Sequence, residues 1–253
     1  MCESCGRQLH HPLAPSRRKF ILGAAAVGLA FTNPATARGK KKEEDDDEKK
    51  KKPPKPENVI SPDASLKRLM DGNARYVGGV ARRHDFKHER EALAGGQNPF
   101  AGILSCADSR IAPEYAFDSA RGDLFVCRLA GNFANDDSIA SLEYGVAVLN
   151  VPLILVLGHD ACGAVDATIK SLKDNTTLPG HLPSLVTALS PAVKAVSGKG
   201  GDVLDNAIRQ NVIDNVAKLK AAGPILSAAV EQRKLKVVGG IYRLKDGKVD
   251  MVA

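Results

Sequence analysis

The sequence predicts an α/β domain built on a mainly parallel β-sheet flanked by helices, with an N-terminal helical arm and an antiparallel edge strand. Two observations carry this prediction. Short apolar runs of strand length alternate with stretches long enough for a crossover helix, a pattern typical of parallel sheets. Apolar residues also recur at helical spacing in several segments, which predicts helices packed on one core.

The domain begins with a helix signature. Ser61 is a favoured N-cap residue, Pro62 suits the first helical position, and apolar residues follow along one face. Gly78 and Gly79 should end this helix. A second, shorter helix is expected from Phe86 to Ala94, which completes the N-terminal helical arm.

The sheet and its crossovers follow from the remaining apolar pattern. In chain order we expect strands at 100–106 and 124–130, a helix at 138–149, a strand at 152–158, a helix at 203–219, a strand at 236–244, a turn at 245–248 and a short edge strand at 249–252. The last strand should pair antiparallel with its neighbour because only a turn separates the two. No internal repeat is found.

Charge and length limit the class of function. The 253-residue chain has a formal net charge of +7, yet residues 58–253 hold 23 basic and 21 acidic side chains. This part of the chain is nearly balanced, so its charge gives no support for a nucleic-acid-binding surface. Its length suits one catalytic domain of ordinary size.

The segment before this domain is expected to be an export signal followed by a linker. An Arg17-Arg18 pair precedes the apolar stretch 20–31, so residues 1–37 resemble a twin-arginine signal and predict a periplasmic protein. As a helix the apolar stretch would be ~18 Å long, short of the ~30 Å hydrocarbon core, so no stable membrane insertion is expected after signal removal. Residues 38–57 are charged and proline-containing, and predict a disordered linker.

Three cysteines lie in residues 58–253, at positions 106, 127 and 162. An oxidising compartment usually pairs cysteines, and three cannot all pair within one chain. Cys127 lies inside the apolar run LFVCRL, where we expect a small buried side chain. Cys106 and Cys162 instead follow strand-like runs and stand beside polar residues, which singles them out.

Ligand-type side chains gather at the ends of two predicted strands. Cys106 and Asp108 follow the first strand, whereas His159 and Cys162 follow the third. Ligands of open α/β sheets bind outside the carboxyl ends of the strands, so these four residues should reach one edge. Two thiolates and an imidazole suit zinc, with a carboxylate as an acceptable fourth ligand.

Other interpretations of these cysteines remain open at this point. One is a disulfide between Cys106 and Cys162, and another is a structural zinc site with all four positions permanently closed. A phosphatase loop would need an arginine six positions after its cysteine, as in C-x5-R, but Arg110 comes four after Cys106.

These motifs resemble the β-class carbonic anhydrases. The resemblance covers most of residues 60–253, and its most specific feature is CADSR followed about fifty residues later by GHDACG. The matching stretches are LKRLMDGNARYVGG (66–79), QNPFAGILSCADSR (97–110), GDLFVCRLAGN (122–132), SLEYGVAVL (141–149) and VLGHDACGAV (156–165).

The resemblance implies a reaction and its machinery. Cys106, His159 and Cys162 would bind one Zn²⁺ per subunit, and zinc-bound hydroxide would hydrate carbon dioxide reversibly to bicarbonate and a proton. Asp108 and Arg110 correspond to the catalytic dyad of the family, in which the arginine keeps the aspartate ionised and the aspartate accepts the hydroxide's proton in a hydrogen bond. In the closed form of the family this aspartate binds zinc itself.

The resemblance also implies substrate-binding residues and a partner. The corresponding positions are Gln97, Phe125, Ala130, Tyr144 and Gly163. The pocket of the family is completed across a subunit interface, so a homodimer or a dimer of dimers is expected. Its ligands would be carbon dioxide and bicarbonate.

Two residues depart from the family pattern. Leu129 replaces an asparagine, which bears on the hydrogen bonds near Arg128, and Ile103 stands where one branch carries tryptophan, which predicts that a non-catalytic bicarbonate pocket is absent. The alternatives to carbonic anhydrase activity are hydrolysis of carbon disulfide or carbonyl sulfide on the same scaffold, and zinc binding without turnover.

Overall fold

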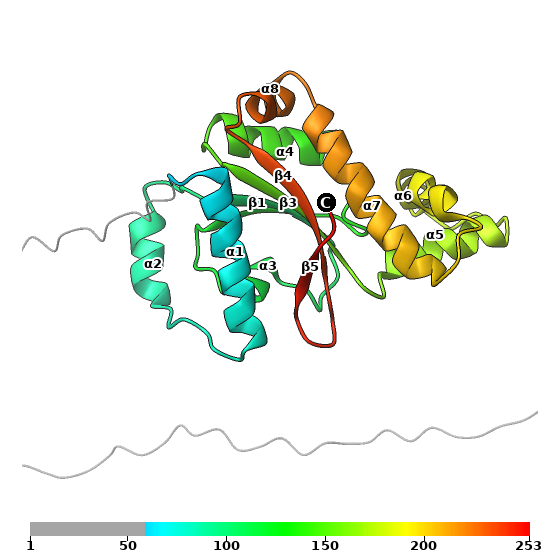
Figure 1. Cartoon of the computed structure of the whole chain (residues 1–253), viewed down its shortest axis with the longest axis horizontal. Coiled ribbons are helices and arrows are strands. Elements are labelled where there is room, and N and C mark those ends of the chain that lie inside the picture. The colour runs from blue at the N-terminus through cyan, green and yellow to red at the C-terminus, as the bar shows by residue number, and fades with distance from the viewer. Residues whose placement is uncertain (1–58) are drawn as a thin grey trace, which may run out of the picture. The chain divides into compact units, whose positions relative to one another are not determined.

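The structure, a computed structural model, describes residues 59–253, which form a five-stranded sheet with helices around it (Figure 1). The expected export signal and the linker lie outside the described residues and stay predictions. Within residues 59–253, no helix combines the length and the apolar character needed to cross a bilayer.

The sheet has the predicted mainly parallel form. Its strands are β1 (Ala101–Ser105), β2 (Leu124–Arg128), β3 (Leu153–His159), β4 (Lys236–Tyr242) and β5 (Val249–Met251). Their order across the sheet is β2-β1-β3-β4-β5, and every pair is parallel except β4 with β5. The antiparallel edge strand is therefore confirmed.

Eight helices surround the sheet in the described part of the chain. They are α1 (Pro62–Val77), α2 (Phe86–Leu93), α3 (Pro113–Ala116), α4 (Asp136–Ala147), α5 (Gly163–Lys173), α6 (Pro183–Val196), α7 (Val203–Ala221) and α8 (Ile225–Glu231). The predicted helices correspond to α1, α2, α4 and α7, whereas the sequence analysis did not specify α3, α5, α6 or α8.

The helix ends follow from local capping. Ser61 accepts a hydrogen bond from the Ala64 N–H at 3.2 Å, Pro62 opens α1, and Gly78 ends it, as predicted. Helix α4 begins two residues earlier than expected because Asn135 and Ser138 form a capping box.

Strand β3 is the centre of the domain. All seven of its residues are buried, as expected for a parallel strand with both faces covered. The register pairs Ser105 of β1 with Leu157 of β3. Beyond this pair β1 ends, whereas β3 continues to His159, so Cys106 and His159 come to the same edge of the sheet.

Helices cover both faces of the sheet. A Cβ on Gly102 would meet Leu142 of α4, and a Cβ on Gly158 would meet Val212 of α7, and the register places both glycines on the same face. Tyr242 of β4 projects from the opposite face, where its hydroxyl lies 3.0 Å from that of Tyr76 in α1.

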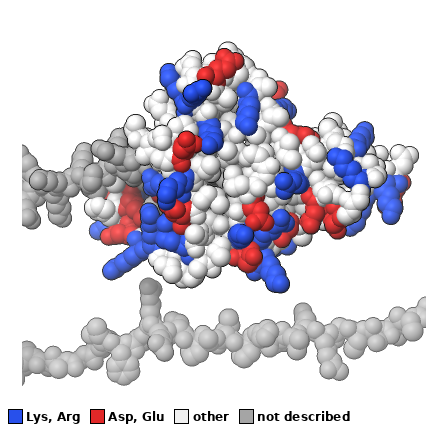
Figure 2. Space-filling view, in the orientation of Figure 1, with Lys and Arg blue, Asp and Glu red and all other residues white. Residues whose placement is uncertain are grey.

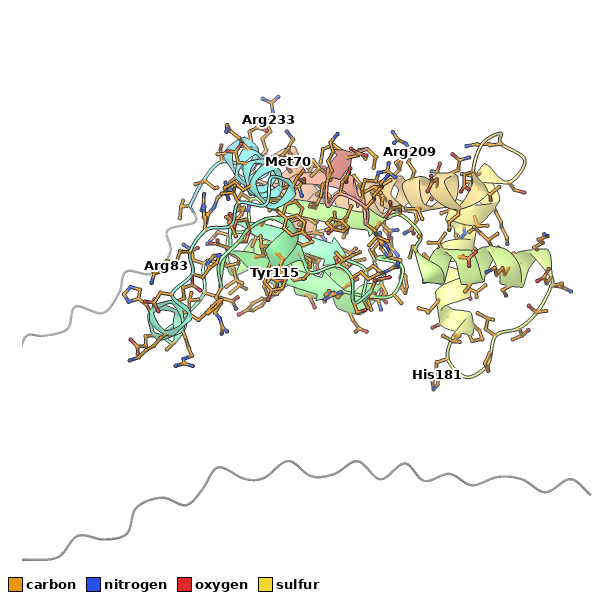
Figure 3. All side chains as sticks on the ribbon, turned by 90° about the horizontal axis from the view of Figure 1, so that it is seen from below. Met70, Arg83, Tyr115, His181, Arg209 and Arg233 are labelled. Carbon is orange, nitrogen blue, oxygen red and sulfur yellow. The ribbon has the colours of Figure 1, made fainter. Side chains whose placement is uncertain are left out.

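The ends of the domain are formed by helices that stand away from the sheet. Arg83, beside α2, lies at one end, and His181, in the loop before α6, lies at the other (Figure 3). Basic and acidic side chains both occur across the face shown in Figure 2.

A buried carboxylate ties the helical arm to the domain. Asp118, which follows α3, accepts hydrogen bonds from Arg75 Nε at 2.6 Å and from the Arg82 N–H at 2.9 Å. Burial alone would raise the pKa of Asp118, but these bonds outweigh it and lower the pKa. Asp118 also has a left-handed backbone with φ of +42°, a conformation that asparagine shares.

Asp118→Asn should therefore destabilise the protein without disturbing its backbone. Removing this charge should lower the free energy of unfolding at pH 7 by roughly 1.5–3 kcal/mol. Because the folded pKa lies below the unfolded value of about 3.9, this contribution is complete above that pH and is lost as the pH falls through the folded pKa. Denaturant unfolding measured from pH 7 to pH 2 should show that the free energy of unfolding falls less with acid in the variant than in the unaltered protein.

The matched control is Asp71→Asn, which removes an exposed pair with Lys67 on α1 and should cost less than about 0.5 kcal/mol. Equal midpoints at pH 7 for Asp118→Asn and the unaltered protein would contradict this account of the arm.

Candidate metal centre

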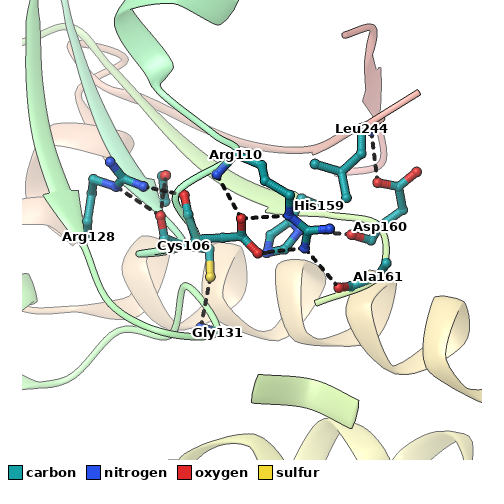
Figure 4. Close-up of polar contacts among 10 residues, drawn as sticks. Cys106, Arg110, Arg128, Gly131, His159, Asp160, Ala161 and Leu244 are labelled. Atoms are coloured by element: carbon teal, nitrogen blue, oxygen red, sulfur yellow. Dashed lines mark hydrogen bonds and ion pairs between the residues drawn. The ribbon is translucent and has the colours of Figure 1, made fainter. Parts of the chain in front are cut away.

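The first candidate ligand lies directly after β1. Cys106 is buried, and its Sγ accepts a hydrogen bond from the Gly131 N–H at 3.3 Å (Figure 4). The thiol is at this place because β1 ends at Ser105 and the chain turns out of the sheet.

The second candidate ligand is the last residue of β3. The side chain of His159 is fully buried, and its Nδ1 lies 2.8 Å from the Asp160 carbonyl oxygen. A carbonyl can only accept, so Nδ1 carries a proton, and in the neutral imidazole this leaves a lone pair on Nε2. Nε2 is buried and has no hydrogen-bond partner among the described residues, which is the state expected of a metal ligand.

The third candidate ligand caps the helix that follows β3. Cys162 is buried and is the N-cap residue of α5. One ligand atom each from Cys106, His159 and Cys162 lie within 4.8 Å of one another. Both cysteines are free thiols, so the disulfide alternative is not formed in this structure.

The two thiols are not equivalent. The pKa of Cys106 is lowered to about 4, chiefly because the Cys162 thiol hydrogen-bonds to it, with further help from backbone N–H groups, against the opposing effect of burial. The same contact and burial raise the pKa of Cys162. A cation bound at this cluster would favour the thiolate form of both.

The donor set fits zinc. Two thiolates and one neutral imidazole nitrogen are the soft and borderline donors that zinc prefers, and three protein ligands leave a fourth position for water or substrate. The orphaned Nε2 of His159 supplies the one neutral donor such a centre needs.

A carboxylate borders this cluster. Asp108 Oδ2 lies 4.0 Å from His159 Nε2, and both carboxylate oxygens accept hydrogen bonds from the Arg110 side chain at 2.9 and 2.7 Å. These bonds hold the pKa of Asp108 far below its ordinary value. In this structure Asp108 thus faces Arg110 and lies beside the three-ligand cluster.

Arg128 fixes the backbone that carries Cys106 and Asp108. Its Nε donates to the Cys106 carbonyl at 2.9 Å, and its Nη2 donates to the Asp108 carbonyl at 2.7 Å (Figure 4). The Leu129 backbone also exchanges hydrogen bonds with Ser105 and Ala107. The leucine at 129 therefore leaves the local hydrogen bonds in place, although the sequence departs from the family pattern there.

The remaining predicted site residues fall into two groups. Ala130 precedes Gly131, and Gly163 follows Cys162 with open space where a Cβ would be, so both lie at the edge of the sheet that carries the cluster. Ile103, the second departure, is buried inside β1.

The other group lies at the opposite end of the strands. Phe125 pairs with Gly102 at the start of β1, about 10 Å along β2 from the strand's end at Arg128. The ring of Tyr144 in α4 is tilted by 34° against that of Phe125, with centroids 6.3 Å apart, and Gln97 is exposed in the segment leading into β1. Within one chain, these three residues do not surround the cluster.

Several residues that shape the site escaped the sequence analysis. Residue spacing in the sequence does not show the backbone directions on which three contacts depend. These are the hydrogen bonds of the Asp160 carbonyl, of the Gly131 N–H and of the Arg128 side chain. Cys127 is half-buried rather than fully buried, though it packs against the core as expected. The sequence did contain a signal for buried polar side chains in α7, because Asn211 and Asn215, four positions apart, interrupt its apolar stripe.

Comparisons with known proteins place these motifs in a family. The family described as carbonic anhydrase matches residues 101–249. Carbonic anhydrase 2 of Mycobacterium tuberculosis is 40% identical over 74% of this chain and 91% of its own length, and the carbonic anhydrase of Mycolicibacterium smegmatis is 38% identical over 76% and 93%. One of two tetrameric β-carbonic anhydrases from Sordaria macrospora superimposes with a TM-score of 0.60 at 25% identity, covering 75% of this chain and 98% of that one.

Because the cluster contains Cys106 and Cys162 but not Cys127, we expect Cys127 to be dispensable for metal binding. Cys162→Ser should lower zinc affinity by more than the roughly 10- to 100-fold typical of losing an outer-shell partner, because a first-shell thiolate is removed. Cys127→Ser, which changes the cysteine outside the cluster, should bind one zinc per chain. Metal analysis after dialysis against a weak chelator measures both, and zinc loss in Cys127→Ser alone would refute the assignment.

Proposed function

Since the chain belongs to the β class of carbonic anhydrases, we propose that it hydrates carbon dioxide reversibly to bicarbonate at a zinc ion held by Cys106, His159 and Cys162. The observation that carries this proposal is the convergence of the three ligand atoms within 4.8 Å, with His159 Nε2 buried and unpartnered. When bound, zinc supplies a Lewis acid that activates a water molecule as a nucleophile near neutral pH.

Asp108 is suited to orient the attacking water. Arg110 keeps the carboxylate ionised, so Asp108 can only accept hydrogen bonds. A water molecule that gives one proton to this acceptor has a lone pair directed elsewhere, toward the carbon of the substrate. Arg110 Nη2 also contacts the Ala161 carbonyl at 3.4 Å, which links the dyad to the loop that carries Cys162.

A second copy of the chain would complete the substrate pocket. Gln97, Phe125 and Tyr144 lie at the far end of the strands from their own cluster, and Tyr144 is half exposed. In a two-fold dimer these side chains can face the cluster of the partner. We propose a homodimer or a dimer of dimers; the similar β-carbonic anhydrases from Sordaria macrospora are tetrameric.

The dyad favours catalysis over zinc storage. A storage site needs only its ligands, whereas Asp108 and Arg110 form a charged pair beside the cluster, with Asp108 Oδ2 4.0 Å from His159 Nε2. Hydrolysis of carbonyl sulfide or carbon disulfide would use the same groups, so a rate measurement must separate these substrates.

Asp108→Asn should abolish most hydration while zinc stays bound. The amide presents donors as well as an acceptor and no longer pairs with Arg110 as an anion, so we expect kcat/KM for carbon dioxide to fall by about 10²–10⁴. Stopped-flow hydration with a pH indicator measures the rate, and metal analysis confirms the ion. Asp166→Asn, an exposed change in α5, is the matched control and should keep the full rate.

The result for the unaltered, zinc-loaded protein distinguishes the alternatives. Turnover of carbonyl sulfide without hydration of carbon dioxide would favour the hydrolase, and zinc binding without either rate would favour a storage protein. A full hydration rate in Asp108→Asn would remove the proposed role of the dyad.

The shared pocket can be tested by mixing two inactive variants. Gln97→Ala and Asp108→Asn should each retain less than about a tenth of the activity, since each removes one polar contact to the reacting groups. If each site takes Gln97 from one subunit and Asp108 from the other, a mixed dimer has one unaltered site. Random reassociation should then restore about a quarter of the wild-type activity.

The control for this mixing experiment is each variant denatured and refolded alone, which should regain nothing. Activity of the mixture equal to the mean of the two refolded variants would show that each site is built within one subunit.

A further inference from the structure

The candidate zinc ligand Cys106 accepts a hydrogen bond from the loop that follows β2. The Gly131 N–H donates to Cys106 Sγ at 3.3 Å in a buried position. A hydrogen bond to a thiolate withdraws charge from sulfur and fixes the direction of its lone pairs. The placement of Gly131 therefore affects how this sulfur binds a metal.

The backbone at Gly131 allows this contact only for glycine. Its φ is +88°, and a Cβ would lie 2.8 Å from the Leu189 side chain of α6. Side chains rarely adopt this conformation, so glycine is needed to aim the N–H.

Helix α7 holds Gly131 from the other side. Asn211 Nδ2 donates to the Gly131 carbonyl at 2.8 Å, and the N–H of the same peptide, which belongs to Asn132, donates to Leu129 at 2.8 Å. The carbonyl of this peptide is thus held by Asn211 of α7, and its N–H is held by the Leu129 carbonyl just after β2.

The amide of Asn211 is itself held in one orientation. Its Oδ1 accepts from Asn215 Nδ2 at 2.9 Å, and Asn215 Oδ1 accepts from the Ala134 N–H at 2.7 Å. Lys218 completes the row by donating to the Ala134 carbonyl at 2.6 Å. Because Oδ1 of Asn211 is engaged as an acceptor, its Nδ2 must face Gly131.

This row of amides lies on a face of α7 that is otherwise apolar. Its buried neighbours include Ile208 and Val212, whereas Arg209 is exposed on the outer side of the helix (Figure 3). Aliphatic side chains would be enough to pack this helix against the sheet. A buried amide, in contrast, lowers the stability of the fold unless all of its hydrogen bonds are made.

We propose that Asn211 is a positioning residue of the metal centre, which keeps the Gly131 N–H aimed at Cys106 Sγ and so retains the ion and sets the donor strength of that sulfur. The inference rests on the proposed zinc site, yet Asn211 touches neither the ion nor the substrate. It acts through Gly131 alone.

The test replaces the amide by an apolar side chain of similar size. In Asn211→Leu the donor to Gly131 is lost, while Asn215 keeps a partner in the backbone carbonyl of residue 211. Transfer of zinc from the full-length, loaded protein to an excess of a coloured chelator should become about 10-fold faster or more. Asn211→Ala gives the same comparison if the leucine disturbs folding.

A spectroscopic readout separates positioning from general loosening. In the cobalt-substituted protein, loss of the N–H bond raises the energy of the sulfur electrons, so the sulfur-to-cobalt charge-transfer band should move to lower energy. Leu219→Ala, a buried truncation farther along α7, is the matched control. It should lower the thermal midpoint with little change in zinc release or in the cobalt band.

The outcomes are distinct. Release and spectra of Asn211→Leu and Asn211→Ala that match the unaltered protein would overturn the inference, as would equally fast release from Leu219→Ala. An unaltered protein that binds no zinc would overturn the proposed function, and this inference with it.

Discussion

The site depends on one constraint of the fold, the parallel pairing of β1 with β3. The register joins Ser105 to Leu157, and β1 ends at this level while β3 continues for two more residues, so both strands deliver their following side chains to the same edge of the sheet. Cys106 then needs one step beyond its strand, and His159 is the last residue of its own. A shift of one residue along either strand would also turn every side chain to the other face.

Around this pairing, the chain fixes the directions of its polar groups rather than adding more ligands. Arg128 donates to two carbonyls of the turn after β1, and the Asp160 carbonyl accepts a hydrogen bond from His159 Nδ1. Each of these partners makes a hydrogen bond to a residue that would bind metal or substrate. The geometry of the centre is therefore a property of three loops and α7 together, as is usual for sites with an ordered outer shell.

The sequence predicted the parts of the fold that rest on periodicity. Ser61 and Pro62 marked the start of α1, and the apolar runs marked the strands within a few residues, because capping and burial are local effects. Helix α6 was not specified, since Pro191 lies within it and interrupts its pattern. The three candidate ligands that cluster in the structure were predicted from strand ends. The contact of the Gly131 N–H was not predicted, because it depends on a left-handed backbone and on contacts with residues 80 positions away.

The carbonyl behind His159 also determines the charge of the centre. A neutral oxygen, and not a carboxylate, accepts the Nδ1 proton, so the only anionic donors in the cluster are the two sulfurs. Their combined charge would equal that of a divalent ion in size, and Asp108 is already neutralised by Arg110. With a divalent ion bound, such a centre would carry no net charge, so an uncharged substrate would enter freely and an anionic product would have little electrostatic reason to stay.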